Sequence, residues 1–217
     1  MNDYLILKLQ GPMQAWGKES FEGLRPSELF PGRSALLGLL AACLGIDRND
    51  REGQQTLAAS VYFAVRVDQQ GQKMTDYHTV KNAREDYRGL KSHDTIQTWR
   101  EYWQDAYYTV AVWNTDKATK TLAEITQAIK NPLYTPVLGR RSCPLARPLF
   151  ENTLTAESAL AALAQIGNHQ GTVYSEESSK GAIELTKRDV PITHQPRQFA
   201  SRTVYLTTSQ GVPHVPQ

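Results

Sequence analysis

The sequence lacks several features that would assign a chain to a familiar class at once. Its longest apolar run covers residues 35–46, whereas a membrane helix needs about 20 such residues. The two cysteines, Cys43 and Cys143, show no paired spacing, and a free cysteine such as Cys43 inside an apolar run usually behaves as a small hydrophobe. Residues 1–10 lack the basic start and the cleavage site of a secretory signal. These absences favour a reduced, cytoplasmic setting away from membranes.

Catalytic and metal-binding motifs are also missing. There is no G-x-G-x-x-G, Walker A, H-E-x-x-H or G-x-S-x-G pattern, and the five histidines do not have metal-ligand spacing. We therefore expect no metal and no cofactor. The acidic stretch at residues 175–178 is interpreted as a solvated turn. Tyr77, His78 and Lys81 form the one set that could move a 2′-hydroxyl proton and stabilise a phosphorane, although a structural role is favoured.

Net charge is only +2, with a pI of about 8.5, but the basic residues are unevenly distributed. Residues 131–150 hold three arginines and no acid, and residues 186–202 hold four basic residues against Asp189 alone. This distribution predicts an anionic partner, although a solvated basic surface explains it equally well. Arg33, expected at a helix N-terminus, is placed to bind a phosphate or to pair with a carboxylate such as Glu28.

Hydrophobic patterning predicts both strands and helices. In one strand, the alternation directs four apolar residues inward and Tyr62 and Arg66 outward. Helices are expected at residues 35–44 with Ser34 as the N-cap, from a cap at Asp116 to Asn131, and at residues 156–166. Strands are expected at residues 3–9, 61–67, 107–113, 182–187 and 202–207.

This order of elements predicts an α+β fold, namely a ferredoxin-like (RRM-type) βαββαβ domain with a C-terminal β-containing extension. Residues 1–76 and 106–217 would form this palm domain. An insert at residues 77–105 separates the second and third strands, which form a hairpin in this topology. The insert is therefore expected to project from the end of the sheet as a thumb.

The insert divides into two halves by composition. Ser92 or Asp94 would cap a helix that places Ile96, Trp99 and Trp103 on one stripe for packing. The preceding half surrounds Gly89 with arginine, lysine and aromatic residues that stack on bases and neutralise phosphates, although a solvated loop is an equal alternative. Because the net charge of the insert is close to zero, positioned side chains are expected rather than a general electrostatic attraction.

Seven stretches together resemble one family. They are YLILKLQGPMQAWG, RSALLGLLAACLGI, DYHTV, AREDYRGLKSHDTIQTWREY, YTPVLGRRSCPLARPLF, YSEES and PRQFASR. From Tyr4 to about Arg202 the sequence resembles the CasD family, the Cas5-type (RAMP superfamily) subunits of Cascade, the type I-E CRISPR surveillance complex.

The resemblance implies a CRISPR RNA-binding protein that caps the 5′ handle of the guide and joins CasC backbone subunits to the large subunit CasA. Target DNA would be read by the guide within the assembled complex. Relatives in type I-C systems cleave the repeat RNA, whereas the type I-E pattern implies no catalysis. A protein adaptor without RNA contact is a further alternative. The RNA-binding residues implied by motif position and chemistry are Gln14, Trp16, Arg33, Ser34, His78, Arg84, Tyr87, Arg88, Lys91, His93, Arg100, Arg140, Arg141 and Arg202.

Overall fold

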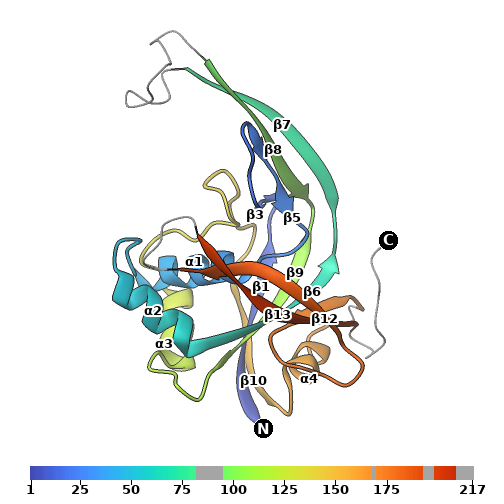
Figure 1. Cartoon of the computed structure of the whole chain (residues 1–217). Helices are drawn as coiled ribbons and strands as arrows, with labels where there is room; N and C mark the ends of the chain where they lie inside the picture. The colour runs from blue at the N-terminus through green and yellow to red at the C-terminus, as the bar shows by residue number, and fades with distance from the viewer. Residues whose placement is uncertain (82–94, 168–169, 193–197, 209–217) are drawn as a thin grey trace.

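A computed structural model describes residues 1–81, 95–167, 170–192 and 198–208 of the chain. Its base is a seven-stranded sheet in which every neighbouring pair of strands is antiparallel (Figure 1). In spatial order the strands are β10 (Phe150–Ala156), β1 (Asn2–Gln10), β9 (Tyr107–Asn114), β6 (Val61–Gln69), β11 (Thr172–Ser175), β13 (Phe199–Thr208) and β12 (Ile183–Pro191). All five predicted strands are confirmed.

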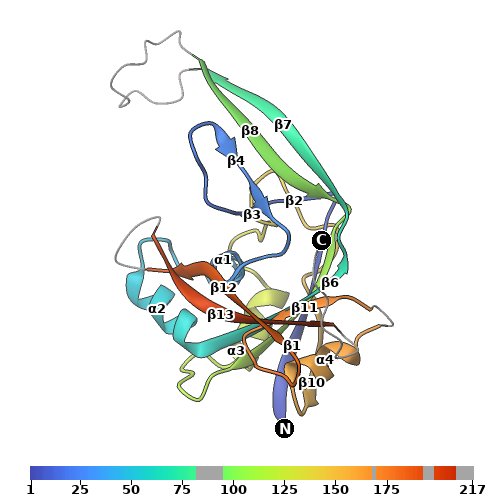
Figure 2. The same ribbon diagram turned by 45° about the vertical axis from the view of Figure 1, so that its right-hand side comes forward.

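Helices cover both faces of this sheet (Figure 2). On one face, α1 (Arg33–Leu44) and α3 (Leu122–Lys130) bury the larger core, and α2 (Arg51–Ser60) packs beside α1. On the other face, α4 (Ala159–Ala164) buries a smaller core. Double coverage explains why β1 and β9 are almost continuously apolar. Among the described residues, no helix is long and apolar enough to span a membrane.

Coverage by α4 also overturns the predicted orientation of Arg66. This side chain is fully buried rather than outward-facing. Its guanidinium pairs with Asp68 at 2.6 Å and donates to the carbonyl oxygens of Leu163 and Ile166 at 2.5 and 2.7 Å. Lys8 pairs with the other Asp68 oxygen at 2.8 Å. Arg66 and Asp68 on β6 thus belong to a buried ion network, and Arg66 also satisfies carbonyl oxygens at the end of α4.

Several predicted helix boundaries are wrong. The N-cap of α1 is Gly32, not Ser34, because the Asp189 carboxylate accepts a hydrogen bond from the Arg33 backbone N–H at 2.8 Å. The N-cap of α3 is Thr121, not Asp116, and it forms a capping box with Glu124. Helix α4 begins after its N-cap Ser158 and ends at Ala164, so it is shorter than the predicted helix.

Cys43 packs in the larger core as expected, and burial raises the pKa of its thiol to about 11. A thiol with this pKa is protonated at neutral pH and has little reactivity.

The acidic stretch at residues 175–178 is not a solvated turn. The Glu176 side chain is only 7% exposed and pairs with Arg33 at 2.7 Å and with Arg202 at 3.0 Å, while the Phe63 backbone N–H donates to it at 2.9 Å. Arg202 also pairs with Asp189 at 2.6 Å. This network of two arginines and two carboxylates ties the start of α1 to β12 and β13. We call it the Glu176 network.

The predicted helix at Ile96–Trp103 is a strand, β8 (Thr95–Gln104), which pairs with β7 (Gln72–Lys81) along their whole length. The helical spacing of Ile96, Trp99 and Trp103 is coincidental, and a segment rich in threonine and aromatic residues favours a strand. β7 and β8 form a long ribbon that extends away from the base sheet (Figure 1). We call this ribbon the arm; the predicted insert boundary at Tyr77 falls inside β7.

We expect Glu176→Gln to lower the free energy of unfolding by about 3–5 kcal/mol, because it leaves the buried Arg33 guanidinium without its carboxylate partner. Urea titration measures this change. Glu19→Gln is the matched control, since Glu19 pairs with Arg188 at an exposed site and its loss should cost less than about 1 kcal/mol. Equal effects of the two substitutions would contradict the structural role of the network.

We also expect a pH signature from Asp189. Burial alone would raise its pKa, but hydrogen bonds and charge from Arg202, together with the Arg33 N–H, lower it below the ordinary value. The stabilisation is therefore present above the unfolded pKa of about 3.9 and is lost as pH falls through the lower folded value. Asp189→Asn should be less stable at neutral pH, and its deficit should shrink on acidification below about pH 4 in urea titrations. A deficit that is constant with pH would refute this.

Candidate nucleic-acid interface

The root of the arm is fixed by contacts with the N-terminal segment. Gly71 turns β6 into β7 at φ 71°, where a Cβ would lie 2.0 Å from the Gln104 carbonyl oxygen. The buried amide of Gln14 donates to the carbonyl oxygens of Leu9 and Ala106 at 3.3 and 2.5 Å. One side chain therefore joins the end of β1 to the start of β9, beside the point where the arm leaves the sheet.

Strand β8 is the central strand of a second, four-stranded sheet (Figure 2). β7 pairs along one edge; β2 (Met13–Gln14) and the parallel strand β4 (Leu24–Arg25) pair along the other. A small ribbon of β3 (Trp16–Gly17) and β5 (Ser27–Glu28) packs beside it, where the Trp103 indole donates to the Glu28 carbonyl oxygen at 2.7 Å. The base of the arm is therefore held along the edge of β8 that does not pair with β7.

Three arginines gather on one face of this second sheet, which we call the basic face. Arg25 and Arg100 are register partners on neighbouring parallel strands, so their side chains lie on the same face. Arg140 donates to the carbonyl oxygens of Glu101 and Arg25 at 3.0 and 2.9 Å, and its guanidinium lies 4.6 Å from the centre of the Tyr102 ring. Within the described residues, none of these three arginines pairs with a carboxylate.

The basic face is well suited to bind an anion. Asp76 lies opposite Arg100 across β7 and β8 and is the nearest acid in the register. Arg25 beside Arg100 is a like-charge pair, which is destabilising on paired strands, and Asp76 opposite Arg100 offsets part of that cost. A phosphate bound between them would remove that cost and would gain charge-assisted hydrogen bonds.

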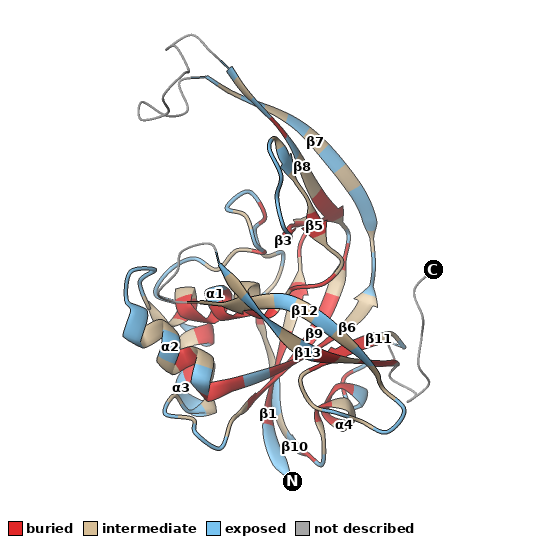
Figure 3. Ribbon diagram, viewed as in Figure 1, coloured by how far each residue is buried: buried red, intermediate tan, exposed pale blue. Residues whose placement is uncertain are grey.

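The residues that alternate with Asp76 on β7 and with Arg100 on β8 form the other face of the arm, and many of them are exposed (Figure 3). Tyr77 and Trp99 are register partners whose ring centres lie 5.5 Å apart. His78 lies on the basic face with Arg100 because successive strand residues alternate. The three residues that could form a nuclease site are therefore divided, with Tyr77 and Lys81 on one face and His78 on the other.

The base sheet itself does not offer an RNA platform. RNA-binding sheets of the RRM type stack bases on aromatic residues of an open face. Here Tyr4 and Trp113 on the α4 side are buried in the smaller core with ring centres 5.6 Å apart, and the exposed Tyr62 packs against Trp113. The exposed chemistry suited to RNA therefore lies on the arm and beside it.

The structure sorts the implied RNA-binding residues into three groups. Gln14 and Trp16 are buried at the arm root, while the buried Arg33 and the partly exposed Arg202 pair with acids of the Glu176 network. Arg33 pairs with an acid, as the simpler alternative held, but the acid is not Glu28. Arg140 and Arg100 lie together on the basic face, Arg141 is exposed beside them in sequence, Ser34 is half-buried in α1, and His78 is on β7. The remaining implied residues lie outside the described part of the chain: Arg84, Tyr87, Arg88, Lys91 and His93.

Sequence reasoning missed Arg25, which follows a loop and has no motif to mark it. Its role depends on the parallel pairing with β8, a contact between distant segments that local patterning does not encode.

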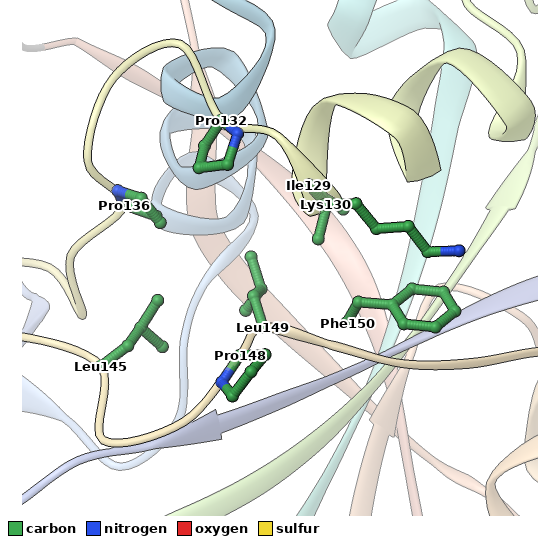
Figure 4. A pocket seen from close by; sticks show the side chains of 8 residues that line it. All are labelled: Ile129, Lys130, Pro132, Pro136, Leu145, Pro148, Leu149 and Phe150. Atoms are coloured by element: carbon green, nitrogen blue, oxygen red, sulfur yellow. The ribbon is translucent and has the colours of Figure 1, made fainter.

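Elsewhere the surface offers less chemistry. An apolar hollow of about 340 Å³ lies between the end of α3 and the start of β10, with the Lys130 ammonium 4.1 Å from the centre of the Phe150 ring (Figure 4). Its other lining residues are prolines and aliphatic residues, so no set of polar groups converges there. Among the described residues, no group of three or more histidine, cysteine or acidic side chains is placed to hold a metal ion.

Comparison with known proteins identifies the class. Residues 4–205 match the family described as CRISPR-associated protein (Cas_Cas5). The match covers most of the chain, and the chain belongs to this family.

A relative and two structures give a closer comparison. The chain is 54% identical to the CRISPR system Cascade subunit CasD of Escherichia coli (strain K12), over 95% of this chain and 96% of that protein. It is similar to a chain of a CRISPR RNA-guided surveillance complex, with a TM-score of 0.72 and 26% identity over 94% of this chain and 88% of that one. A crystal structure of a Cas protein matches with a TM-score of 0.67 and 27% identity over 99% and 100% of the two chains.

Proposed function

We propose that this protein is the Cas5-type, CRISPR RNA-binding subunit of a type I-E Cascade. Its 54% identity to the Escherichia coli Cascade subunit CasD over nearly the whole of both chains is the observation that carries this proposal. The subunit caps the 5′ handle of the guide RNA and joins CasC backbone subunits to CasA. Target DNA contacts the assembled complex, in which base pairing with the guide reads the sequence.

The fold supports an RRM-type palm with a thumb. Strands β10, β1, β9 and β6 lie in the spatial order fourth, first, third and second, which is the order of a ferredoxin-like unit. The arm interrupts the hairpin of the second and third of these strands. We propose that the arm is the thumb and that strands β11 to β13 are the C-terminal extension.

We assign the guide RNA to the basic face of the arm. Arg25, Arg100 and Arg140 supply positive charge there that no carboxylate of the described residues pairs with, and the Tyr102 ring contacts the Arg140 guanidinium. Arginine planes stack on bases and bind phosphates, so this face suits a single-stranded handle. We also propose that the exposed Arg141 contacts the guide RNA, as do Arg84, Tyr87, Arg88, Lys91 and His93, which lie outside the described part of the chain.

The arrangement of β7 supports a non-catalytic role. A metal-independent nuclease needs its proton-transfer groups to converge on one 2′-hydroxyl and its phosphate. Tyr77 and Lys81 lie on the face opposite to His78, which opposes such convergence. The alternative function, cleavage of CRISPR repeat RNA by these three residues, is therefore disfavoured.

We expect Arg25→Gln to weaken retention of the guide RNA without lowering stability. In complex reconstituted with this variant, RNA affinity should fall, and the slope of affinity against salt should decrease by about 0.7–1 because one phosphate contact is lost. The free energy of unfolding should stay within about 0.5 kcal/mol of wild type, since a like-charge pair is removed. Filter binding over a salt series and urea titration measure the two quantities.

Arg147→Gln is the matched control for this substitution, because Arg147 is a basic residue that pairs with Glu151. It should leave RNA retention unchanged. If Arg25→Gln retains RNA as well as this control does at every salt concentration, the basic face is not the guide-binding surface.

We expect the purified protein to leave its cognate repeat RNA intact in the presence of EDTA, as judged by denaturing gel electrophoresis. His78→Ala should behave identically. Site-specific cleavage by the wild type that disappears in His78→Ala would establish the nuclease alternative.

A further inference from the structure

The arm leaves the base sheet through two residues whose backbone is in the left-handed region (Figure 1). Gly71 lies between β6 and β7 at φ 71°, and Asp105 lies between β8 and β9 at φ 53°. Aspartate tolerates this region better than most residues but adopts it at a cost. The register of β6 with β9 also shifts between Val67 and Gln69, and such bulges change the direction of a strand. We call residues 69–72 and 104–106 the joint.

Two glutamine side chains link the segments that meet at the joint. Gln69 donates to the Asp105 carbonyl oxygen at 2.8 Å and so ties the two connections to each other. Gln14, through its bonds to the Leu9 and Ala106 carbonyl oxygens, ties the joint to β1. Among the described residues, the buried carbonyl oxygen of the Gln14 side chain has no hydrogen-bond partner, which costs stability. Stability alone therefore does not explain a glutamine at this position.

The basic face is assembled from two parts of the molecule that meet at the joint. Arg100 lies on β8 of the arm, and Arg25 pairs beside it. Arg140 instead follows Leu138, which is buried in the larger core of the base. Arg140 reaches the arm only through its hydrogen bonds to the carbonyl oxygens of Glu101 and Arg25. The angle of the arm at the joint therefore determines whether the three arginines lie together.

A small rotation at the joint is enough to disturb this face. Arg100 is four positions from Gln104 on β8, and a strand rises about 3.3 Å per residue, so Arg100 lies about 13 Å from the joint. A rotation of about 10° would move Arg100 by about 2 Å relative to Arg140. Hydrogen bonds form over a heavy-atom range of only about 2.7–3.2 Å, so a phosphate held by both arginines would lose a contact. Only molecules with the arm at the right angle would then bind with full affinity.

We propose that Gln14 and Gln69 are positioning residues for guide RNA binding, because they lock the joint at the angle that brings Arg25 and Arg100 to Arg140. The proposal rests on the proposed function, which assigns the RNA to the basic face. Gln14, whose motif implied a direct RNA contact, acts through the arm instead. A site that is ordered in advance gains affinity because binding does not have to order it.

The double variant Gln14→Met and Gln69→Ala tests this proposal. Methionine is close to glutamine in length and lacks both donors, and Gln69 is exposed, so its truncation leaves no cavity. The angle of the arm is measured in the purified full chain by double electron–electron resonance. Spin labels are attached at Thr79→Cys on β7 and Thr153→Cys on β10, both at exposed positions. The two native cysteines are buried and burial raises the pKa of their thiols, so the introduced cysteines react selectively.

We expect the distribution of distances between the labels to become about twice as wide in the double variant. In the reconstituted complex, guide RNA affinity should fall about fivefold or more, because a smaller fraction of molecules has the arm at the binding angle. The slope of affinity against salt should not change, since the bound state keeps every phosphate contact. Gln69→Ala alone should give a smaller broadening of the same kind, so the test does not depend on the folding of Gln14→Met.

The matched control is Asn114→Leu, at the far end of β9 from the joint. Asn114 is also a side-chain amide that donates to two backbone carbonyl oxygens, those of Ser60 and Lys120, both at 2.9 Å. Its loss should lower stability but leave the label distances and the RNA affinity as in wild type.

The proposal is overturned if the label distances in the glutamine variants are distributed as narrowly as in this control. It is also overturned if the distribution widens while RNA affinity stays at the control value, or if the salt slope falls. Failure of the guide-binding proposal is distinguishable, because it would show as full RNA retention in Arg25→Gln whatever the label distances are.

Discussion

One carboxylate connects parts of the chain that are far apart in sequence. Glu176 receives hydrogen bonds from Arg33 at the start of α1 and from the backbone of β6, and it forms an ion pair with Arg202 on β13. Three segments that are far apart in the sequence are thereby joined at one point. Because burying this charge is compensated only while both arginines stay in place, the position of the helix and that of the C-terminal strands depend on each other.

Because helices cover both faces of the base sheet, the proposed RNA-binding surface lies on the arm. A sheet with an open face could bind RNA directly, but α4 and the Arg66 ion network occupy that face here. The proposed recognition surface is instead on a second sheet built around β8, where Arg25 and Arg100 lie on one face and Tyr77 and Trp99 on the other.

Five of the seven base strands could be predicted because local alternation and apolar runs determine them, whereas β10 and β11 were not predicted. β8 could not, since Ile96, Trp99 and Trp103 fit a helical spacing as well as they fit a strand, and pairing with β7 decided between them. Arg33 was placed correctly at a helix start, but its acidic partner came from a segment 143 residues away. Likewise, the proximity of Arg25 to Arg100 depends on parallel pairing. Contacts of this range carry no local signal.

The parallel pairing of β4 with β8 also affects how the chain folds. Leu24 can pair with Trp99 only after the residues between them have been synthesised. Closing the loop between these two residues costs chain entropy before any contact forms. Non-local pairings of this kind slow folding. The second sheet should therefore assemble late, after the base sheet has brought its two ends together. During synthesis, the N-terminal segment that holds β2 and β4 has no strand to pair with until β8 has left the ribosome.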